Sequence, residues 1–398
     1  MNKIRTLVVD DSLFMRLTLT RILEIDGDIE VVGEAKDGAA AIEKVKQLRP
    51  DVVILDLVMP VMDGLTALKH IMSECPTPVI IFSASTREGA RETLDALALG
   101  AVDFVTKPGH SVPANGTLSP GETSPGNVAL PGSVALPGSV ALPGSVALHN
   151  IHRELSDKVK AAHASRISAA ADTVATRERL QAVLEKLAHV PHLPPEGETA
   201  PVHSGNKSKR LFAIAASTGG PTALQAVLSG LPADLDAGGV IVLHIAQGFT
   251  GPLATRLDEL SPVKVHEAHD GAVILPGTAF VAPTGLHLTV RQQQEDLVIR
   301  LVPEPSDALH RPSADVMFES IAGCCATDTC GVILTGMGSD GAQGLCAVHR
   351  NGGYTIAQDE ASSIIYGMPR RAVELGGVDI SLPLDQIAAE IVRVTKRR

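Results

Sequence analysis

The segment DVVILDLVMP (51–60) contains a four-residue apolar run that ends at Asp56. A continuous apolar run is typical of a strand in a parallel sheet whose two faces are both covered by helices. Four similar runs lie around it: TLVVDD (6–11), EVVGEA (30–35), PVIIFSAS (78–85) and AVDFVTKP (101–108). Amphipathic segments such as 12–24 and 38–48 separate these runs. We therefore predict a doubly wound α/β domain of five strand–helix units over residues 1–108.

Polar side chains follow the predicted strands at the end where such sheets bind ligands. They are Asp10, Asp11, Asp56, Ser83 and Lys107. Converging carboxylates repel one another unless a cation lies among them, and hard oxygen ligands of this kind suit Mg²⁺. Because Lys107 adds a positive charge and Ser83 a hydroxyl, the set indicates that Asp56 accepts a phosphoryl group. The alternative is a plain doubly wound domain whose acidic residues contact only solvent.

Five separated motifs, in this order, resemble those of a response-regulator receiver domain, which has a flavodoxin-like fold. They are DD at 10–11, Asp56 followed by MP (59–60) and DG (63–64), Ser83, and KP at 107–108. The resemblance implies that a histidine kinase phosphorylates Asp56. It implies that Mg²⁺ is bound by Asp11, Asp56, the backbone carbonyl of Val58 and, through water, Asp10. It also implies that Ser83, Phe104 and Lys107 sense the phosphoryl group.

Residues 109–209 differ in character and are interpreted as a long linker. Three complete VALPGS repeats and the start of a fourth occupy 128–148. Each Leu-Pro-Gly suits a type II turn, and six residues are too few for a self-supporting unit, so we interpret the repeats as linker, with an apolar docking segment as the alternative. Apolar residues recur at helical spacing from 151 to 187, which predicts a helix. The Pro-rich segment 190–209 is interpreted as further linker.

A second α/β pattern extends over residues 210–398. Its predicted strands are 211–217, 240–245, 263–268, 279–283, 286–290, 297–302, 331–336 and 354–358. Its predicted helices are 221–228, 252–259, 315–325 and 342–350. The pattern predicts another doubly wound, mostly parallel sheet, with a short antiparallel excursion near 279–302.

Three of these strands bring a hydroxyl, an imidazole and a carboxylate to one edge of the second sheet. Ser217 ends one strand and precedes Gly-Gly-Pro, which is typical of a helix start and lies near the positive end of a helix dipole. His244 ends the next strand, and Asp340 follows a third. Singly, the serine would suit an N-cap and the histidine a core position. Together they predict a nucleophile, a general base and an orienting acid.

The segment LTGMGSDGAQG (334–344) places Asp340 among four glycines. Glycines are used where backbone must come close to another group or adopt a positive φ. We expect them to let substrate and backbone approach Asp340. We also expect a main-chain N–H near Met337 to face the oxyanion that develops during acyl transfer.

Residues 210–395 resemble the Rossmann-like catalytic domain of the chemotaxis protein-glutamate methylesterases, the CheB family. The matching motifs are ASTGG (216–220), His244 with GFT (248–250), LTGMGSDGAQG (334–344) and QDEASSIIYGMPRRA (358–372). A receiver followed by this domain is the architecture of that family. The resemblance implies hydrolysis of γ-glutamyl methyl esters on the cytoplasmic helices of chemoreceptors, and deamidation of glutamines there.

The same resemblance assigns roles to single residues. It implies that Ser217 is the nucleophile, His244 the general base and Asp340 its orienter. It places Thr218 and Met337 near the active site, with the backbone of Met337 in the oxyanion hole, and it implies no cofactor in this domain. The histidines at 266, 269 and 287 and the loop 366–369 are interpreted as structural rather than substrate-contacting.

Regulation is implied as well. In the family the unphosphorylated receiver packs over the active site, and phosphorylation loosens that packing. The linker 109–209 has 101 residues, which is unusually long for the family. A fully flexible chain of that length spans roughly 50–60 Å, so the depth of gating stays open.

Composition limits the remaining classes of function. The 398 residues are 44% hydrophobic and 2% aromatic, with a net charge of −11, so the cores must consist of Val, Ile, Leu and Ala. The acidic balance argues against nucleic acid as a partner. The N-terminus is unlike a signal peptide and no run of 18 apolar residues occurs, so we expect a cytoplasmic protein without membrane insertion. The five cysteines fit no zinc template and are interpreted as buried free thiols: Cys75, Cys324, Cys325, Cys330 and Cys346.

Two other functions compete with a chemotaxis methylesterase. One is a docking or signalling module of a two-component pathway, which the complete set of three catalytic residue types disfavours. The other is an esterase or amidase that acts on a protein outside chemotaxis, which those residues do not distinguish.

Overall fold

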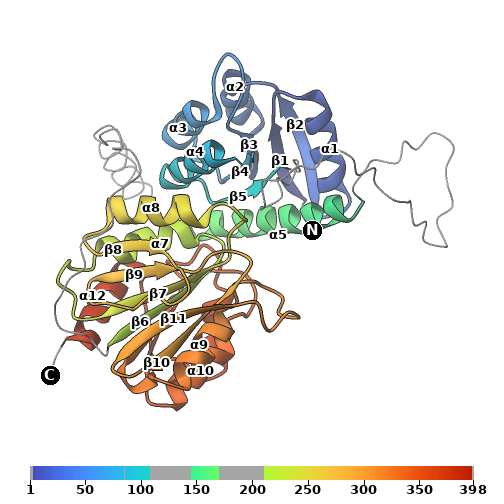
Figure 1. The fold of residues 1–398 in the computed structure, drawn as a ribbon. Helices are drawn as coiled ribbons and strands as arrows, with labels where there is room; N and C mark the ends of the chain where they lie inside the picture. Colours follow the sequence, from blue (N-terminus) through green and yellow to red (C-terminus); the bar gives the residue numbers. More distant parts are fainter. Residues whose placement is uncertain (1–2, 85, 108–144, 170–209, 397–398) are drawn as a thin grey trace, which may run out of the picture.

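The computed structural model describes residues 3–84, 86–107, 145–169 and 210–396. Within these residues the chain forms two α/β bodies, one above the other in Figure 1. The N-terminal body contains a sheet of five strands, and the C-terminal body contains a sheet of seven strands and a separate two-stranded sheet. Every strand pairing in the two large sheets is parallel. The predicted fold class is therefore confirmed.

The N-terminal body has the strand order β2-β1-β3-β4-β5, which is a doubly wound order. Its strands are β1 (Ile4–Val9), β2 (Ile29–Ala35), β3 (Val52–Asp56), β4 (Val79–Ser83) and β5 (Asp103–Thr106). Its first four helices are α1 (Leu13–Glu24), α2 (Gly38–Leu48), α3 (Gly64–Glu74) and α4 (Arg87–Ala98). All five predicted strands are present, each within a few residues of the predicted bounds.

Each of these four helices begins at a polar N-cap residue. The side chains of Ser12, Asp37, Asp63 and Thr86 each accept a hydrogen bond from a backbone N–H in the first turn. Such caps satisfy N–H groups that have no partner inside the helix. The chain changes from strand to helix within three residues after β1, β2 and β4, whereas the loop after β3 has seven residues.

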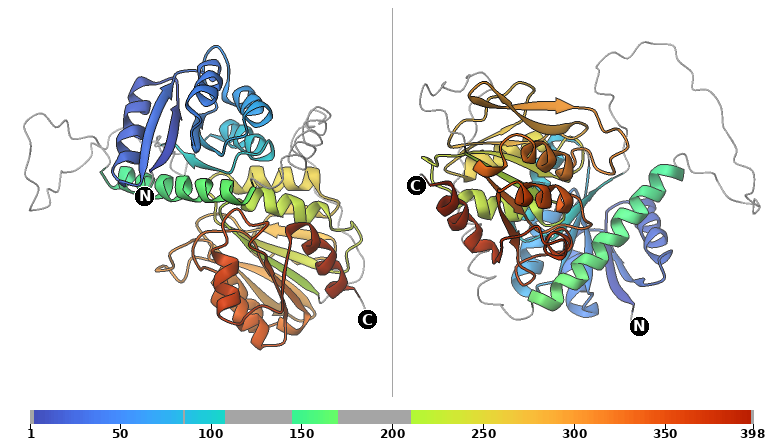
Figure 2. Two further views of the ribbon diagram at one scale, coloured as in Figure 1. Left: turned by 180° about the vertical axis from the view of Figure 1, so that it is seen from behind. Right: turned by 90° about the horizontal axis from the view of Figure 1, so that it is seen from below.

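Helix α5 (Ser145–Ala169) packs on the N-terminal body, against α1 and the strands β3, β4 and β5. Figure 2 shows it lying along that body. Leu155, Val159 and Ala162 are fully buried, and they join an apolar cluster that includes residues of β1, β3 and β4. Their spacing of four and three residues puts them on one face of the helix. Although α5 follows the repeats, it covers the sheet of the N-terminal body.

The bounds of this helix differ from the predicted 151–187. Helix α5 begins at Ser145, six residues earlier, at the last residue of the third copy of the repeat. The fourth copy continues as His149-Asn150, where the earlier copies have Pro-Gly, so it lacks the proline that would interrupt a helix. Residues 170–187, the repeats before Ser145 and the Pro-rich segment lie outside the described residues.

The C-terminal body has the strand order β14-β13-β12-β6-β7-β9-β8. Its strands are β6 (Leu211–Ala216), β7 (Gly238–Leu243), β8 (Lys264–Glu267), β9 (Thr278–Val281), β12 (Thr329–Ile333), β13 (Tyr354–Gln358) and β14 (Ile380–Leu382), with β10 (His287–Gln293) and β11 (Asp296–Val302) as an antiparallel pair. Its helices are α7 (Gly220–Ser229), α8 (Thr250–Leu260), α9 (Ala314–Ala322), α10 (Ala342–Arg350), α11 (Met368–Glu374) and α12 (Leu384–Thr395), with a short 3₁₀ turn at Ala326–Asp328.

The antiparallel excursion predicted near 279–302 is narrower than expected. It consists of the β10–β11 hairpin, whereas β9 pairs parallel with β7 and β8 in the large sheet. Four elements of this body were not predicted: β14, α11, α12 and the short 3₁₀ turn. β14 has three residues and α11 seven, which is too short for a clear periodic signal. Helix α12 packs on α7 and on the strands β12 and β13, with Ile387 and Ile391 fully buried.

The two bodies meet through helices. Helix α4 packs against α7 and α8. The ring of Phe104 in β5 stacks on that of Phe249 with centroids 4.4 Å apart, and the Arg256 guanidinium in α8 lies 2.7 Å from a carboxylate oxygen of Asp95 in α4. The N-terminal body therefore rests on α7 and α8, the helices that follow β6 and β7.

Candidate functional sites

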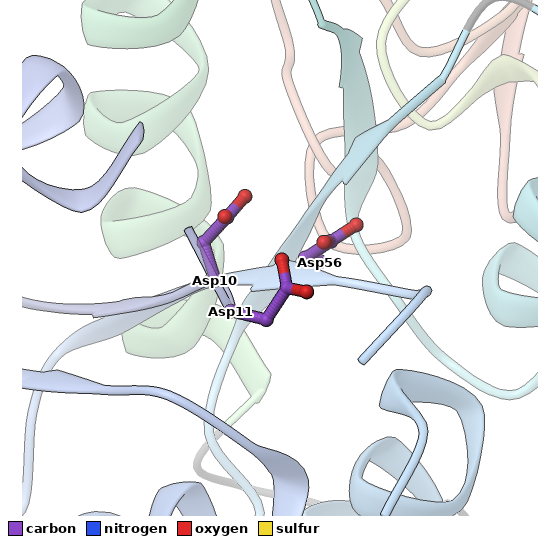
Figure 3. A group of neighbouring side chains, drawn as sticks. All are labelled: Asp10, Asp11 and Asp56. Atoms are coloured by element: carbon purple, nitrogen blue, oxygen red, sulfur yellow. The ribbon is translucent and has the colours of Figure 1, made fainter. Parts of the chain in front are cut away.

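The first candidate site lies at the carboxyl ends of β1 and β3. The parallel register that pairs Val9 with Leu55 brings Asp10 and Asp56 side by side, and Asp11 follows in the next loop. Figure 3 shows the three carboxylates gathered at this edge. Each offers an oxygen within 4.8 Å of the others. Asp10 and Asp56 are buried and Asp11 is exposed, so the cluster opens to solvent on one side.

Lys107 lies against two of these carboxylates. Its Nζ is 2.9 Å from Asp10 Oδ2 and 2.7 Å from Asp56 Oδ2. Burial raises the pKa of Asp56, and the hydrogen bond from Lys107 only partly opposes that effect. Burial acts to lower the pKa of Lys107, but its bonds to Asp10 and Asp56 raise it above its usual range. The lysine therefore stays charged, and one ammonium balances only one of three carboxylates.

This donor set fits a small divalent cation. The oxygens are hard ligands, they converge, and they carry more negative charge than Lys107 neutralises. The backbone N–H of Val58 donates to Asp56 Oδ1 at 3.3 Å, so Val58 belongs to the same loop as the central carboxylate. The residues predicted to hold Mg²⁺ are thus brought together.

The predicted phosphoryl-sensing residues surround the cluster. Ser83 follows Phe82, which pairs with Asp56 across β3 and β4. The Ser83 hydroxyl is buried, donates to Gly89 O at 3.3 Å and accepts from Thr93 Oγ1 at 2.6 Å. To bond a phosphoryl group, it must turn away from these partners.

Phe104 is buried between an aromatic ring, that of Phe249, and a charged group, the ammonium of Lys158. One face stacks on Phe249 of the C-terminal body. The Nζ of Lys158, from α5, lies 5.4 Å from the Phe104 ring centroid and also donates to the Phe104 carbonyl. An ion pair between Lys158 and Asp103 at 3.3 Å holds that lysine in place. Phe104 therefore contacts both α5 and the C-terminal body.

The second candidate site lies at the carboxyl ends of β12, β6 and β7, which are neighbours in the sheet. Asp340, Ser217 and His244 follow these strands in that order. The backbone N–H of Ser217 donates to the Thr335 carbonyl at 3.0 Å, and that of His244 donates to the Ala216 carbonyl at 3.1 Å. The three loops are thus held together by main-chain bonds, and the structure brings the three predicted residues to one place.

Asp340 is held by four donors. His244 Nε2 lies 2.8 Å from Oδ2, and the Ser313 hydroxyl lies 2.7 Å from Oδ1. The backbone N–H groups of Ala314 and Asp315 donate at 2.7 and 3.1 Å. Burial acts to raise the pKa of Asp340, but the bond from His244 and the bonds from Ser313 and Ala314 hold it far below its usual range. Because α9 begins at Ala314, its dipole also favours the carboxylate.

The orientation of the His244 ring follows from this bond. Since Asp340 is ionised, Nε2 carries the proton that it donates. Nδ1 is buried and has no hydrogen-bond partner among the described residues. It is therefore the nitrogen available to take a proton from Ser217, whereas in the chymotrypsin arrangement Nδ1 faces the aspartate. The described side chains include no Ser217–His244 hydrogen bond, and such bonds are often loose before substrate binds.

The structure explains why glycine is required at three positions near Asp340. A Cβ atom on Gly336 would lie 2.8 Å from the Ser217 Cβ and 2.3 Å from the Met368 sulfur, so any side chain there would displace the serine. Gly338 and Gly341 have φ values of 86° and 88°, which other residues rarely adopt. The bare loop lets the backbone before Asp340 pack directly against Ser217.

Thr218 and Met337 lie beside these residues. Thr218 is buried, and its carbonyl accepts a hydrogen bond from Thr335 Oγ1 at 3.1 Å. The side chain of Met337 is 42% exposed, two residues after Thr335 and next to Gly336. Met337 thus lies on the solvent side of the loop that contacts Ser217.

Sequence reasoning missed the residues that support the triad from α9. Ser313 is both the N-cap of α9 and a donor to Asp340, and it ends the segment HRPS (310–313). A serine before an amphipathic run is a helix-start signal, so this position was open to detection. His310, in the same segment, stacks on His244 with ring centroids 4.1 Å apart. No sequence signal indicated that contact.

The other histidines have different surroundings. His287 is fully buried and bonded at both ring nitrogens. His266 and His269 pack near Phe280 and line a cavity of about 1000 Å³ next to β8 and β9. Gln247, in the loop between His244 and α8, also lines it. Among the described cysteines all five are free, and all but the half-buried Cys324 are buried.

Comparison with known proteins identifies both bodies. Residues 6–112 match the family model of the response regulator receiver domain, and residues 212–391 match that of the CheB methylesterase. A protein-glutamate methylesterase/protein-glutamine glutaminase of Symbiobacterium thermophilum is 43% identical over 98% of this chain and 96% of its own length. The chain belongs to this family.

Other members of the CheB family are similar over the full chain. The proteins of the same name from Geobacillus kaustophilus and Pseudomonas aeruginosa, the second numbered 2, are 40% and 42% identical to it. Each alignment covers 99% of this chain, and 99% and 98% of the respective relatives. The family named from the sequence is therefore confirmed. No helix in the described part of the chain is long and apolar enough to cross a membrane.

Proposed function

We propose that this CheB-family protein hydrolyses methyl esters of glutamyl side chains in chemoreceptors, and deamidates glutamines there, as the names of its relatives indicate for them. The observation that carries the proposal is the bond between His244 and Asp340 beside Ser217, with the second imidazole nitrogen left open. The substrate segments are the cytoplasmic helices of the receptors, and the reaction takes place in the cytoplasm.

The geometry supports a two-step acyl transfer. Ser217 Oγ attacks the γ-carbonyl carbon while its proton passes to Nδ1 of His244, and Asp340 stabilises the imidazolium that forms. The tetrahedral intermediate then expels methanol, which takes that proton from His244, and leaves a glutamyl ester on Ser217. Water repeats the sequence, releasing the glutamate and restoring Ser217. With a glutamine substrate the first leaving group is ammonia.

Charge on the attacked oxygen needs donors near Ser217. We assign this role to the backbone N–H of Met337, which takes part in no hydrogen bond within the described part of the chain. Thr218, next to the nucleophile, keeps the loop of residues 334–338 in place through its bond with Thr335. Preorganised donors of this kind supply a large part of the rate enhancement in acyl transfer.

The N-terminal body is proposed to control this reaction through Asp56. A histidine kinase of the same pathway would donate the phosphoryl group. Asp11, Asp56, the Val58 carbonyl and, through water, Asp10 would hold a Mg²⁺ ion, which would supply positive charge beside the phosphoryl oxygens. Lys107 pairs with the phosphoryl group, and Ser83 turns to bond it. Phe104 responds because it lies on β5, three residues before Lys107, which directly follows that strand.

We further propose that α5 completes the receiver unit. It buries Leu155 and Val159 on the sheet of the N-terminal body, and its Lys158 contacts Phe104. The segment between the two bodies would then begin after Ala169, which shortens the tether relative to a linker of 109–209. A shorter tether strengthens the inhibition that an attached domain exerts on its neighbour.

Methanol release from methyl-esterified chemoreceptor tests the proposal. It is measured with the full chain, with and without Mg²⁺ and acetyl phosphate, beside Ser217→Ala and Asp56→Asn. We expect release that rises with the phosphodonor, is lost in Ser217→Ala and stays at the unstimulated rate in Asp56→Asn. Release without phosphodonor dependence would contradict the gating but not the hydrolysis. No release from folded protein would favour a docking module or a different substrate.

A further inference from the structure

His310 makes a contact that the triad does not account for. Its ring lies 4.1 Å from that of His244, centroid to centroid, with only 16° between the planes. The two imidazoles therefore stack face to face, and His310 covers one face of the ring that Asp340 bonds at its edge. His310 itself is half-buried, on the loop between β11 and α9.

A second histidine, His287, is hydrogen-bonded to the loop that contains His310. His287 is fully buried; its Nδ1 lies 3.1 Å from the backbone N–H of Ser313, and its Nε2 lies 3.0 Å from the Pro305 carbonyl. An N–H donates only to an unprotonated nitrogen, and a carbonyl only accepts, so His287 is neutral with its proton on Nε2. One ring thus fixes both ends of the segment that holds His310.

Burial and two neighbouring groups act on the pKa of His310. Burial lowers its pKa, the neighbouring His244 lowers it further, and Asp340 opposes both effects. On its own loop, the guanidinium of Arg311 is turned to the Ser306 carbonyl instead. His310 therefore presents an aromatic face, rather than a hydrogen-bonding edge, to the base.

We propose that His310 is a positioning residue for His244, holding the ring of the general base in the plane in which Nδ1 faces Ser217. The inference rests on the catalytic roles proposed above. The bond to Asp340 fixes one edge of the ring but leaves it free to tilt, and a parallel ring against its face removes that freedom.

The ring of His310, rather than its nitrogens, carries this role. His310→Phe keeps a flat face and removes both nitrogens, whereas His310→Ala removes the face. Since an aromatic stack contributes about 0.5–1.5 kcal/mol beyond burial, we expect kcat to fall roughly 2- to 10-fold in His310→Ala with KM little changed. We expect His310→Phe to keep at least half of the wild-type kcat.

The test is steady-state methanol release from methyl-esterified receptor by the full chain, with Mg²⁺ and acetyl phosphate. Leu309→Ala is the matched control, since Leu309 is the neighbouring residue and is 90% exposed. It should leave kcat unchanged. If His310→Ala does not fold, His310→Gln replaces it, because it also removes the face while keeping a polar side chain.

Three outcomes overturn the inference. Equal kcat in the alanine, phenylalanine and wild-type chains means that the stack contributes nothing. Equal loss in His310→Phe and His310→Ala means that a ring nitrogen of His310 acts in the chemistry. A rise in KM with unchanged kcat means that His310 binds substrate. An inactive wild-type protein, by contrast, would contradict the proposed function itself.

Discussion

The two candidate sites are built on the same scaffold and satisfy their carboxylates in opposite ways. At the carboxyl ends of β1 and β3, three aspartates share one ammonium, that of Lys107. At the ends of β6, β7 and β12, a single aspartate, Asp340, receives four hydrogen bonds. The first arrangement leaves negative charge for a cation to neutralise. In the second, hydrogen-bond donors surround a carboxylate that stays ionised, and its charge is directed at His244.

The comparison also shows where the donors come from. In the N-terminal body the compensating charge is a long side chain from the end of β5. In the C-terminal body two of the four donors are main-chain groups of the first turn of α9. A side chain can move when a phosphoryl group arrives, whereas a helix terminus cannot. The difference suits a switch in one body and a fixed catalytic group in the other.

The largest effect on kcat is expected from Asp340→Asn, which tests the role assigned to the carboxylate of the second site. An amide cannot stabilise an imidazolium and favours the wrong tautomer of His244, so kcat should fall by about 10³- to 10⁴-fold. The measurement is methanol release under phosphorylating conditions. Phosphorylation of Asp56, followed with labelled phosphodonor, should stay at the wild-type level. A kcat within tenfold of wild type would show that Asp340 is not the orienting acid.

A smaller loss is expected from Ser313→Ala. The substitution removes one of the four donors to Asp340 and also the N-cap of α9, so it should cost about 1 kcal/mol of unfolding free energy and roughly tenfold in kcat. Urea unfolding and kcat report the two effects separately. Ser12→Ala removes a comparable N-cap in the other body and serves as the control. It should lower stability without lowering the unstimulated kcat.

A change of a few-fold is expected where the bodies meet. Arg256→Ala removes the 2.7 Å ion pair with Asp95. Both side chains of this pair are mostly buried. Because this pair favours the packed arrangement, its loss should raise the unphosphorylated rate by about 2- to 5-fold, with the phosphorylated rate unchanged. The measurement is the ratio of the methanol-release rate with acetyl phosphate to the rate without it. A lower ratio would support gating through α8, and an unchanged one would contradict it.

The smallest effect concerns the pH dependence of stability. Burial raises the pKa of Asp315 to about 6, although the bond from the Gly344 N–H opposes it. Between an ordinary value near 4 and about 6, the folded state then binds a proton that the unfolded state does not, so stability falls as pH rises through that window. After allowance for solvent screening the loss is on the order of 1 kcal/mol.

Asp315→Asn tests this sign. It keeps an acceptor for the Gly344 N–H and cannot ionise, so the variant should lose that component of the pH dependence. Urea unfolding of both chains at pH 4.5 and 7 measures the difference. A variant with the same pH dependence as wild type would contradict the assignment.

Much of this organisation was predictable because strand order and polar strand ends follow from local patterns. The apolar runs gave every strand except the three-residue β14, and Asp10, Asp11, Asp56, Ser217 and His244 lie at or just after the ends of those strands. His310 and Ser313 were not predicted as site residues, since they reach His244 and Asp340 from a loop that lies more than 25 residues away along the chain. Nothing in local periodicity reports such a contact.

Helix α5 also shows what local sequence patterns cannot predict. The spacing of its apolar residues predicted a helix. An apolar face does not, however, indicate which surface it packs against. The chain leaves β5, passes through the repeats and returns to cover the same sheet with Leu155 and Val159. Sequence position alone assigned that segment to the connection between the bodies.

The sequence by itself determined two parallel sheets and the chemical types of residue at their carboxyl edges, because apolar runs and turn residues act over a few positions. Only the tertiary structure decided which nitrogen of His244 is free, how completely Asp340 is hydrogen-bonded, and that Phe104 of one body stacks on Phe249 of the other. These features depend on ring orientation and on contacts between distant segments, which are fixed only when the whole chain packs.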